Sequence, residues 1–330
     1  MEITMLDRYK GALMGLAVGD ALGTTVEFKS PGSFEPLTDI VGGGPFRLNP
    51  GEWTDDTSMA LCLAESLIEN KGFNGSDQMK KYCDWWKNGY NSSNGRCFDI
   101  GNTVSDALNK FQRSGDPFSG STAENSSGNG CIMRLAPVPL FYRRDTEDAI
   151  EKSGESSRTT HGSVLSVDST KYMAAIILNC LNGKTKEEIL DGETYSNIKE
   201  TMAVKVQEII NGSFKEKQPP EIRGTGFVVA SLEASLWAFY NTDDFKSGCL
   251  AAVNLGDDAD TTGAIYGQIA GAYYGLNGIP DSWVDKIVQK EFILELSEKL
   301  FELAEERWEK RRKRGRFLST DEEDEENLLP

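Results

Sequence analysis

The sequence predicts an all-α fold, and three observations support this prediction. Apolar residues recur at helical spacing, as at Met59, Leu63 and Leu67. No segment shows convincing alternation of polar and apolar residues, the pattern of a half-buried strand. Two segments, 5–23 and the one that follows Asp258, carry a glycine at every fourth position, which places the glycines along one helix face. Glycine destabilises helices, so we expect these two helices to pack in the core with their backbones close together.

Length and charge limit the function classes that remain. The chain has 330 residues and a formal net charge of −17. That length allows a large core in one big domain or two ordinary ones. The negative charge disfavours nonspecific nucleic-acid binding through phosphate neutralisation. Six cysteines without CxxC spacing are typical of a reduced cytoplasmic protein. We therefore expect a cytoplasmic monomer with no membrane span and no nucleic-acid partner.

The N-terminal third is predicted as helices separated by one long loop. The first helix, 5–23, leads into the segment that ends at Glu27. Residues 29–52 contain many Pro and Gly residues and read as a loop. Loops of that length are usually functional or disordered. Helices are then predicted at 56–70 and 77–88, and from Gly101 through Phe111.

The chain continues with a Ser- and Gly-rich segment, 114–130, which ends in the turn Gly128-Asn129-Gly130. Such a turn before a helix presents free N–H groups that can bind phosphate, although most such turns are only turns. Further helices are predicted at 145–153, 163–182, 186–191, 198–211, 225–240, 243–254 and 281–313. Residues 311–330 are charged and lack apolar periodicity, so we predict a disordered tail after a single domain over 1–310.

Two short acidic clusters far apart in the sequence suggest a cation site. They combine carboxylates and hydroxyls with no adjacent Lys or Arg: Thr54, Asp55, Asp56, Asp258, Asp260 and Thr261. Carboxylates held this close raise one another's pKa values unless a positive charge intervenes. Ligand sets made only of oxygen suit Mg²⁺ or Mn²⁺ and suit zinc poorly. Helix capping by the same side chains is the alternative. For one cluster alone the two interpretations are evenly balanced, whereas the two clusters together favour a metal.

His161 is the only histidine in the chain. A single histidine excludes zinc sites built from several histidines, and it leaves only His161 for a Ser-His-Asp triad. A lone histidine more often forms structural hydrogen bonds than takes part in catalysis.

Together these motifs resemble the ADP-ribosylglycohydrolase family, and most of all its bacterial dinitrogenase-reductase-activating type. The matching stretches lie in family order over most of the chain: GLAVGDALGTTVEF from Gly15, TDDTS from Thr54, Gly101–Thr103, GNGCIMRLAP from Gly128, Thr160-His161 and Val253–Gly275. The resemblance implies an orthogonal helical bundle. It also implies a central cleft with a binuclear Mg²⁺ or Mn²⁺ centre.

The resemblance also implies roles for individual residues. The metal ligands would be Thr54, Asp55, Asp56, Asp258, Asp260 and Thr261. The ADP-ribose would be lined by Gly101, Asn102, Gly128, Asn129, Gly130 and His161. Glu27, or a metal-bound carboxylate such as Asp55 or Asp258, would take the proton of the attacking water. We expect Asp99, which the bacterial type also carries, to face the guanidinium. Asp257 stands where many relatives have a second glycine, and the sequence offers no physical account of it.

The implied reaction is hydrolysis of the bond between ADP-ribose and an arginine nitrogen of a modified protein, through an oxocarbenium-like state. One alternative is hydrolysis of O-linked ADP-ribose, on serine or in O-acetyl-ADP-ribose. A second is a non-catalytic ADP-ribose-binding relative, against which the intact Glu27 and metal-ligand matches weigh. A third is immunity to an ADP-ribosylating toxin that combines hydrolysis with occlusion of a partner; the sequence shows no N-terminal extension that would suggest an occluding arm.

Overall fold

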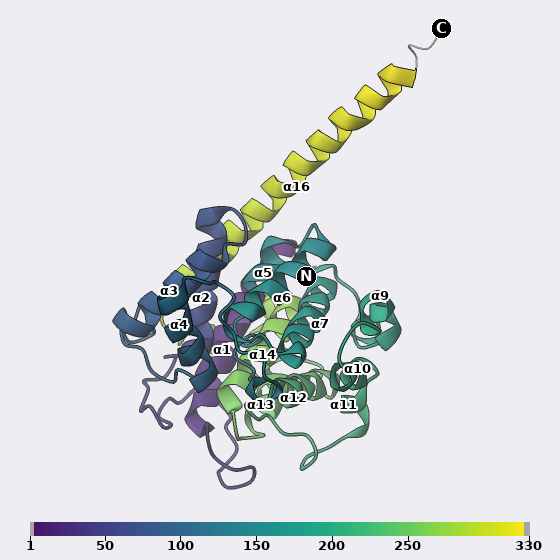
Figure 1. The fold of residues 1–330 in the computed structure, drawn as a ribbon. Coiled ribbons are helices and arrows are strands. Elements are labelled where there is room, and N and C mark those ends of the chain that lie inside the picture. Colours follow the sequence, from purple (N-terminus) through teal and green to yellow (C-terminus); the bar gives the residue numbers. More distant parts are fainter. Residues whose placement is uncertain (1–2, 327–330) are drawn as a thin grey trace.

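The computed structural model describes residues 3–326, and these residues fold into sixteen α-helices with no β-strand (Figure 1). Three isolated β-bridges join loop residues. The predicted all-α fold is confirmed.

Helices α1 (Met5–Gly23) and α14 (Ala259–Tyr274) form the centre of the molecule and run antiparallel. A Cβ atom added at Gly267 would lie 1.9 Å from the carbonyl oxygen of Gly15, and one at Gly19 would lie 2.0 Å from that of Gly263. The obstructing atoms are backbone, so no side chain can move aside, and only glycine permits this contact. The predicted close packing of the two glycine ladders is confirmed.

Other helices surround this pair. On one side lie α2 (Asp55–Asn70), α3 (Gly75–Asn88) and α4 (Asn102–Ser114) (Figure 1). Four others pack against one another or against α14: α6 (Thr146–Thr160), α7 (Val164–Leu181), α12 (Val228–Tyr240) and α13 (Phe245–Val253). The shorter helices are α5 (Pro137–Phe141), α8 (Lys186–Ile189), α9 (Ser196–Lys199), α10 (Val204–Ile210), α11 (Ser213–Glu216) and α15 (Asp281–Val284). The described helix with the length and composition to span a membrane is α7, and 72% of that stretch is buried inside the protein.

Several helix boundaries differ from the predictions. The helix predicted at 198–211 is divided into α9 and α10, because Ala203 has a non-helical backbone and its N–H donates to the Asp168 carboxylate at 2.7 Å. The helix predicted at 281–313 is divided into α15 and α16 (Lys290–Glu326), and Gln289 before α16 has a φ of 56°. The helix predicted at 145–153 continues to Thr160 as α6.

Helix α16 extends beyond the helical body (Figure 1). Arg307 and Arg311 on this helix form salt bridges with Asp148 of α6, and Arg311 also pairs with Asp145. The backbone remains helical over residues 311–326, where the sequence predicted a disordered tail. Glu, Lys and Arg, which dominate this stretch, are good helix formers. The last four residues of the predicted tail, 327–330, lie outside the described residues.

Candidate active site

A cleft of about 890 Å³ collects the predicted site residues. Every residue predicted to act in catalysis or to bind substrate lines it: Glu27, Asp55, Asp99, Gly101, Asn102, Gly128, Asn129, Gly130, His161 and Asp258. Of the predicted metal ligands, Asp55, Asp258 and Thr261 line the cleft, whereas Thr54, Asp56 and Asp260 lie outside its lining and are at most 1% exposed. Residues predicted from separate parts of the sequence therefore meet in one place.

Three long helices, α2, α4 and α14, begin at the cleft. Their N-cap residues are Thr54, Gly101 and Asp258, and within the described residues none of these makes a side-chain cap hydrogen bond. A helix N-terminus carries partial positive charge and unpaired N–H groups. The three ends favour negative charge in the cleft, both from carboxylates and from an anionic ligand.

Asp20, which the sequence analysis did not select, caps α2 from within α1. Its fully buried carboxylate accepts hydrogen bonds from the backbone N–H and hydroxyl of Thr54, both at 2.9 Å, and from those of Thr57 at 3.0 and 2.6 Å. Because Asp20 caps this helix, Asp55 and Asp56 are not needed as caps. The only signal in the sequence is an acidic residue inside an apolar, glycine-rich helix.

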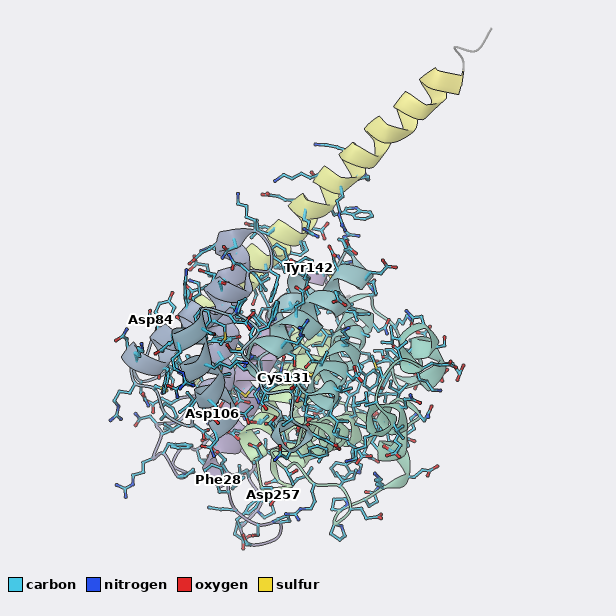
Figure 2. The ribbon with its side chains drawn as sticks, in the orientation of Figure 1. Phe28, Asp84, Asp106, Cys131, Tyr142 and Asp257 are labelled. Atoms are coloured by element: carbon cyan, nitrogen blue, oxygen red, sulfur yellow. The ribbon has the colours of Figure 1, made fainter. Side chains whose placement is uncertain are left out.

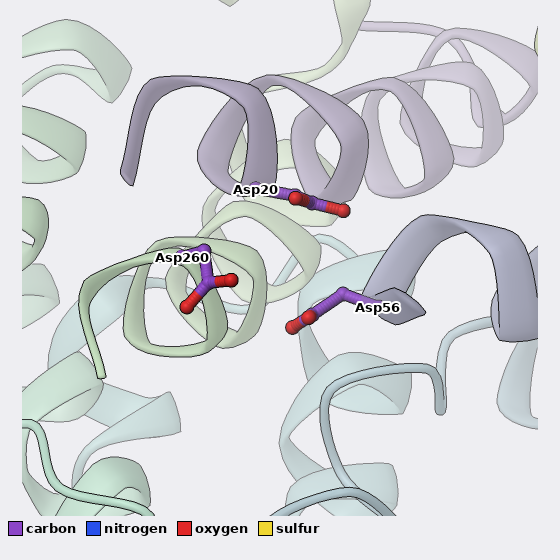
Figure 3. A group of neighbouring side chains, drawn as sticks. All are labelled: Asp20, Asp56 and Asp260. Atoms are coloured by element: carbon purple, nitrogen blue, oxygen red, sulfur yellow. The ribbon is translucent and has the colours of Figure 1, made fainter. Parts of the chain in front are cut away.

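Asp20, Asp56 and Asp260 form what we call the aspartate cluster. They point toward one another from α1, α2 and α14, with carboxylate oxygens within 4.8 Å of one another (Figure 3). The Thr54 hydroxyl oxygen lies 2.9, 3.1 and 3.3 Å from one oxygen of each. A hydroxyl has one proton and can donate to only one of them. Among the described residues, the buried Oδ1 of Asp56 has no hydrogen-bond partner. These oxygens fit a divalent cation.

A second acidic group lies next to the aspartate cluster and shares Asp260 with it. Glu27, Asp99 and Asp260 each place a carboxylate oxygen within 4.8 Å of the other two. Burial first and the Asp99 carboxylate second raise the pKa of Glu27 to about 10, and burial with nearby carboxylates raises the pKa of Asp99 to about 7. The pKa values of Asp56 and Asp260 also lie well above the usual range, through burial and then neighbouring carboxylates. Burial and crowding therefore disfavour the charged forms of these carboxylates, and a bound cation would favour them.

The turn at Gly128–Gly130 faces the acidic groups. The Asn129 side-chain amide donates to Oδ2 of Asp258 at 2.7 Å, so this residue also orients a predicted metal ligand. The N–H groups of Gly130 and Cys131 find no acceptor within the described part of the chain, and Gly130 lines the cleft. The helix predicted directly after the turn is absent from residues 131–134, which form turns, and α5 begins at Pro137.

The structure explains the presence of Asp257 through its contacts. Its carboxylate accepts two hydrogen bonds from Arg223, at 2.9 and 2.8 Å. Its backbone carbonyl accepts from the N–H of Phe28 at 2.7 Å, and its N–H donates to the carbonyl of Lys29 at 2.8 Å. Phe28 and Asp257 lie together at one edge of the molecule (Figure 2). These bonds join the loop after Glu27 to the loop before Asp258.

The comparison with known proteins agrees with this geometry. The sequence model of the ADP-ribosylglycohydrolase family matches residues 1–310. This chain belongs to that family. The ADP-ribosylarginine hydrolase Tri1 of Serratia proteamaculans (strain 568) is 46% identical over 305 residues, which cover 92% of this chain and 82% of that protein. A relative from Rhodospirillum rubrum, named an ADP-ribosyl-dinitrogen reductase glycohydrolase, is 33% identical over 291 residues, or 86% of this chain and 91% of that protein.

Solved structures support the same assignment. A chain described as an ADP-ribosylglycohydrolase-related protein complex matches with a TM-score of 0.82 and 40% identity, covering 91% of this chain and 99% of that one. The predicted family and its helical fold are thus confirmed. In this ADP-ribosylglycohydrolase, Glu27, Asp55, Asp99 and Asp258 line the cleft, and the aspartate cluster around Thr54 lies outside its lining.

Proposed function

We propose that this ADP-ribosylglycohydrolase removes ADP-ribose from arginine side chains of modified proteins in a metal-dependent reaction, with the catalytic domain in residues 1–310. The observation that carries the proposal is the aspartate cluster around Thr54, next to Glu27 and Asp99 in a cleft large enough for a nucleotide. The 46% identity to a protein named an ADP-ribosylarginine hydrolase supports arginine as the linkage.

Two Mg²⁺ or Mn²⁺ ions fit the oxygen donors of this site. The proposed ligands are Thr54, Asp55, Asp56, Asp258, Asp260 and Thr261. The unpartnered Oδ1 of Asp56 and the several acceptors around one Thr54 hydroxyl support cation binding. When bound, such ions supply Lewis acidity and lower the pKa of a coordinated water. Asp20 is proposed to hold the N-terminus of α2, because its oxygens already accept four hydrogen bonds.

The reaction breaks the bond between the ribose anomeric carbon and a guanidine nitrogen, and water forms the new bond to that carbon. Glu27 is 4% exposed and lies beside Asp260, where it is placed to take the water's proton. Asp99 is near enough to Glu27 to face the same reaction centre. The arginine leaves as a neutral guanidine and becomes a guanidinium by taking up one proton, which balances the proton that the water gives to Glu27. The Asp99 carboxylate is suited to pairing with this guanidinium.

Release of ADP-ribose from an arginine-modified protein tests the proposal. The parent should release it with Mg²⁺ or Mn²⁺ and stop after EDTA. Asp56→Asn, which keeps the side-chain volume, should abolish release. Glu208→Ala, at an exposed position on α10, should leave it unchanged. A peptide with serine-linked ADP-ribose serves as the second substrate. Hydrolysis of that peptide alone would refute the arginine assignment, and metal-independent release would refute the role of the aspartate cluster.

A further inference from the structure

Arg134 is a fully buried cation close to the cleft residue His161, and its charge has no carboxylate partner. Among the described residues Arg134 forms no salt bridge, and its side chain is 0% exposed. Its guanidinium lies 4.7 Å from the ring centroid of Tyr82, and Nη2 donates to Oγ1 of Thr160 at 2.6 Å. An unpaired buried charge is costly, so its position calls for an explanation in terms of function.

The hydroxyl of Thr160 connects Arg134 to His161. Its oxygen lies 2.9 Å from Nδ1 of the imidazole. Arginine can only donate, so the Thr160 oxygen accepts from Nη2 and its single proton is available for Nδ1. No other acceptor for this proton occurs in the described part of the chain. If Nδ1 itself carried a proton, the buried Thr160 hydroxyl proton would be unpaired, which is unfavourable. Nδ1 is therefore the acceptor, and the imidazole proton resides on Nε2.

The Nε2 edge of the ring lies against the turn that lines the cleft. A Cβ atom added at Gly128 would lie 3.0 Å from Nε2, and one added at Gly130 would lie 2.7 Å from Cε1. The free N–H groups of Gly130 and Cys131 belong to the same turn. Burial first and the Arg134 charge second lower the pKa of His161 to about 3, so the ring stays neutral.

We propose that Arg134, acting through Thr160, holds His161 in the neutral Nε2–H tautomer, and that this N–H donates to a diphosphate oxygen of bound ADP-ribose. Arg134 and Thr160 are positioning residues, and His161 neither gives up nor takes a proton during the reaction. The identity of the ligand rests on the proposed function, whereas the tautomer does not depend on it.

The single histidine makes the tautomer directly measurable. In the uniformly ¹⁵N-labelled full-length protein, a long-range ¹H–¹⁵N correlation spectrum reports both ring nitrogens of His161 without overlap. We expect a protonated Nε2 and an unprotonated Nδ1 that do not titrate between about pH 5 and pH 8. A ring that is protonated on Nδ1, or that titrates in this range, would overturn the proposal.

Two pairs of variants test the connection to the ligand through the dissociation constant for ADP-ribose, measured by calorimetry. Thr160→Val removes the hydroxyl at nearly constant volume and should give a mixture of tautomers and about tenfold weaker binding, whereas Thr160→Ser should restore both. His161→Gln carries an amide donor near the position of Nε2 and should bind more tightly than His161→Asn, whose amide lies near the position of Nδ1.

Each outcome is decisive without any measurement of hydrolysis. If Thr160→Val keeps the parental tautomer and affinity, the relay through Thr160 is wrong. If Gln and Asn at position 161 bind equally, or if the parent does not bind ADP-ribose, the diphosphate contact is wrong. If the binding results are as expected but the parent does not hydrolyse the arginine linkage, the proposed function is wrong. The tautomer assignment would still stand.

Discussion

Replacing one ladder glycine with alanine should separate the effect of close helix contact from that of helix propensity. In Gly267→Ala, the new Cβ would lie 1.9 Å from the carbonyl oxygen and 2.4 Å from the carbonyl carbon of Gly15. Both atoms belong to the backbone of α1, so relief requires α1 and α14 to move apart by more than an ångström. Such overpacking typically costs about 1–3 kcal/mol or more. Moving the two helices apart would also disturb the contacts at the other glycines of the ladder. We therefore expect a loss of stability at the upper end of this range.

A matched control variant should change the stability in the opposite direction. Gly154 is also inside a helix, α6, but a Cβ atom there would meet the flexible end of the Lys171 side chain, with Cε at 2.5 Å. That side chain can rotate away, so Gly154→Ala should gain up to about 1 kcal/mol from helix propensity. In thermal unfolding of the parent and both variants, Tm should fall by on the order of 5 °C for Gly267→Ala and rise by about 1–2 °C for Gly154→Ala. Shifts of the same sign, or no shift for Gly267→Ala, would refute the argument from backbone contact.

The remaining predictions concern the cleft. Mn²⁺ should raise the stability of the parent by about 2.7 kcal/mol at a hundred times its dissociation constant, and Asp56→Asn should remove this increase in thermal unfolding. Glu27→Gln should lower turnover about a hundredfold or more while ADP-ribose affinity stays within a few-fold; a near-parental turnover would exclude Glu27 as the base. Metal affinity should decrease as pH falls, because the raised carboxylate pKa values let protons compete, and calorimetry in two buffers of different ionisation enthalpy should detect proton release on binding. Asp257→Gly breaks the pair with Arg223, whose side chain is 51% exposed, so unfolding free energy should change by less than about 1 kcal/mol.

The sequence by itself determined the helical class, the contact between α1 and α14 and many of the residues that line the cleft. Helical periodicity is a local property, and a ladder such as Gly15, Gly19 and Gly23 specifies a close-packed face whatever surrounds it. The acidic clusters could also be found, because carboxylates without adjacent cations are unusual in any fold.

Only the tertiary structure decided how these residues are oriented. Asp20 caps α2 across 34 positions of sequence, the Asp168 carboxylate accepts from Ala203 where the predicted helix 198–211 divides, and Arg134 reaches His161 through a threonine hydroxyl. Each of these interactions joins polar groups from separate elements. Periodicity and local spacing carry no information about such a pairing, because it exists only after the helices have packed and excluded the water that would otherwise satisfy the same polar groups.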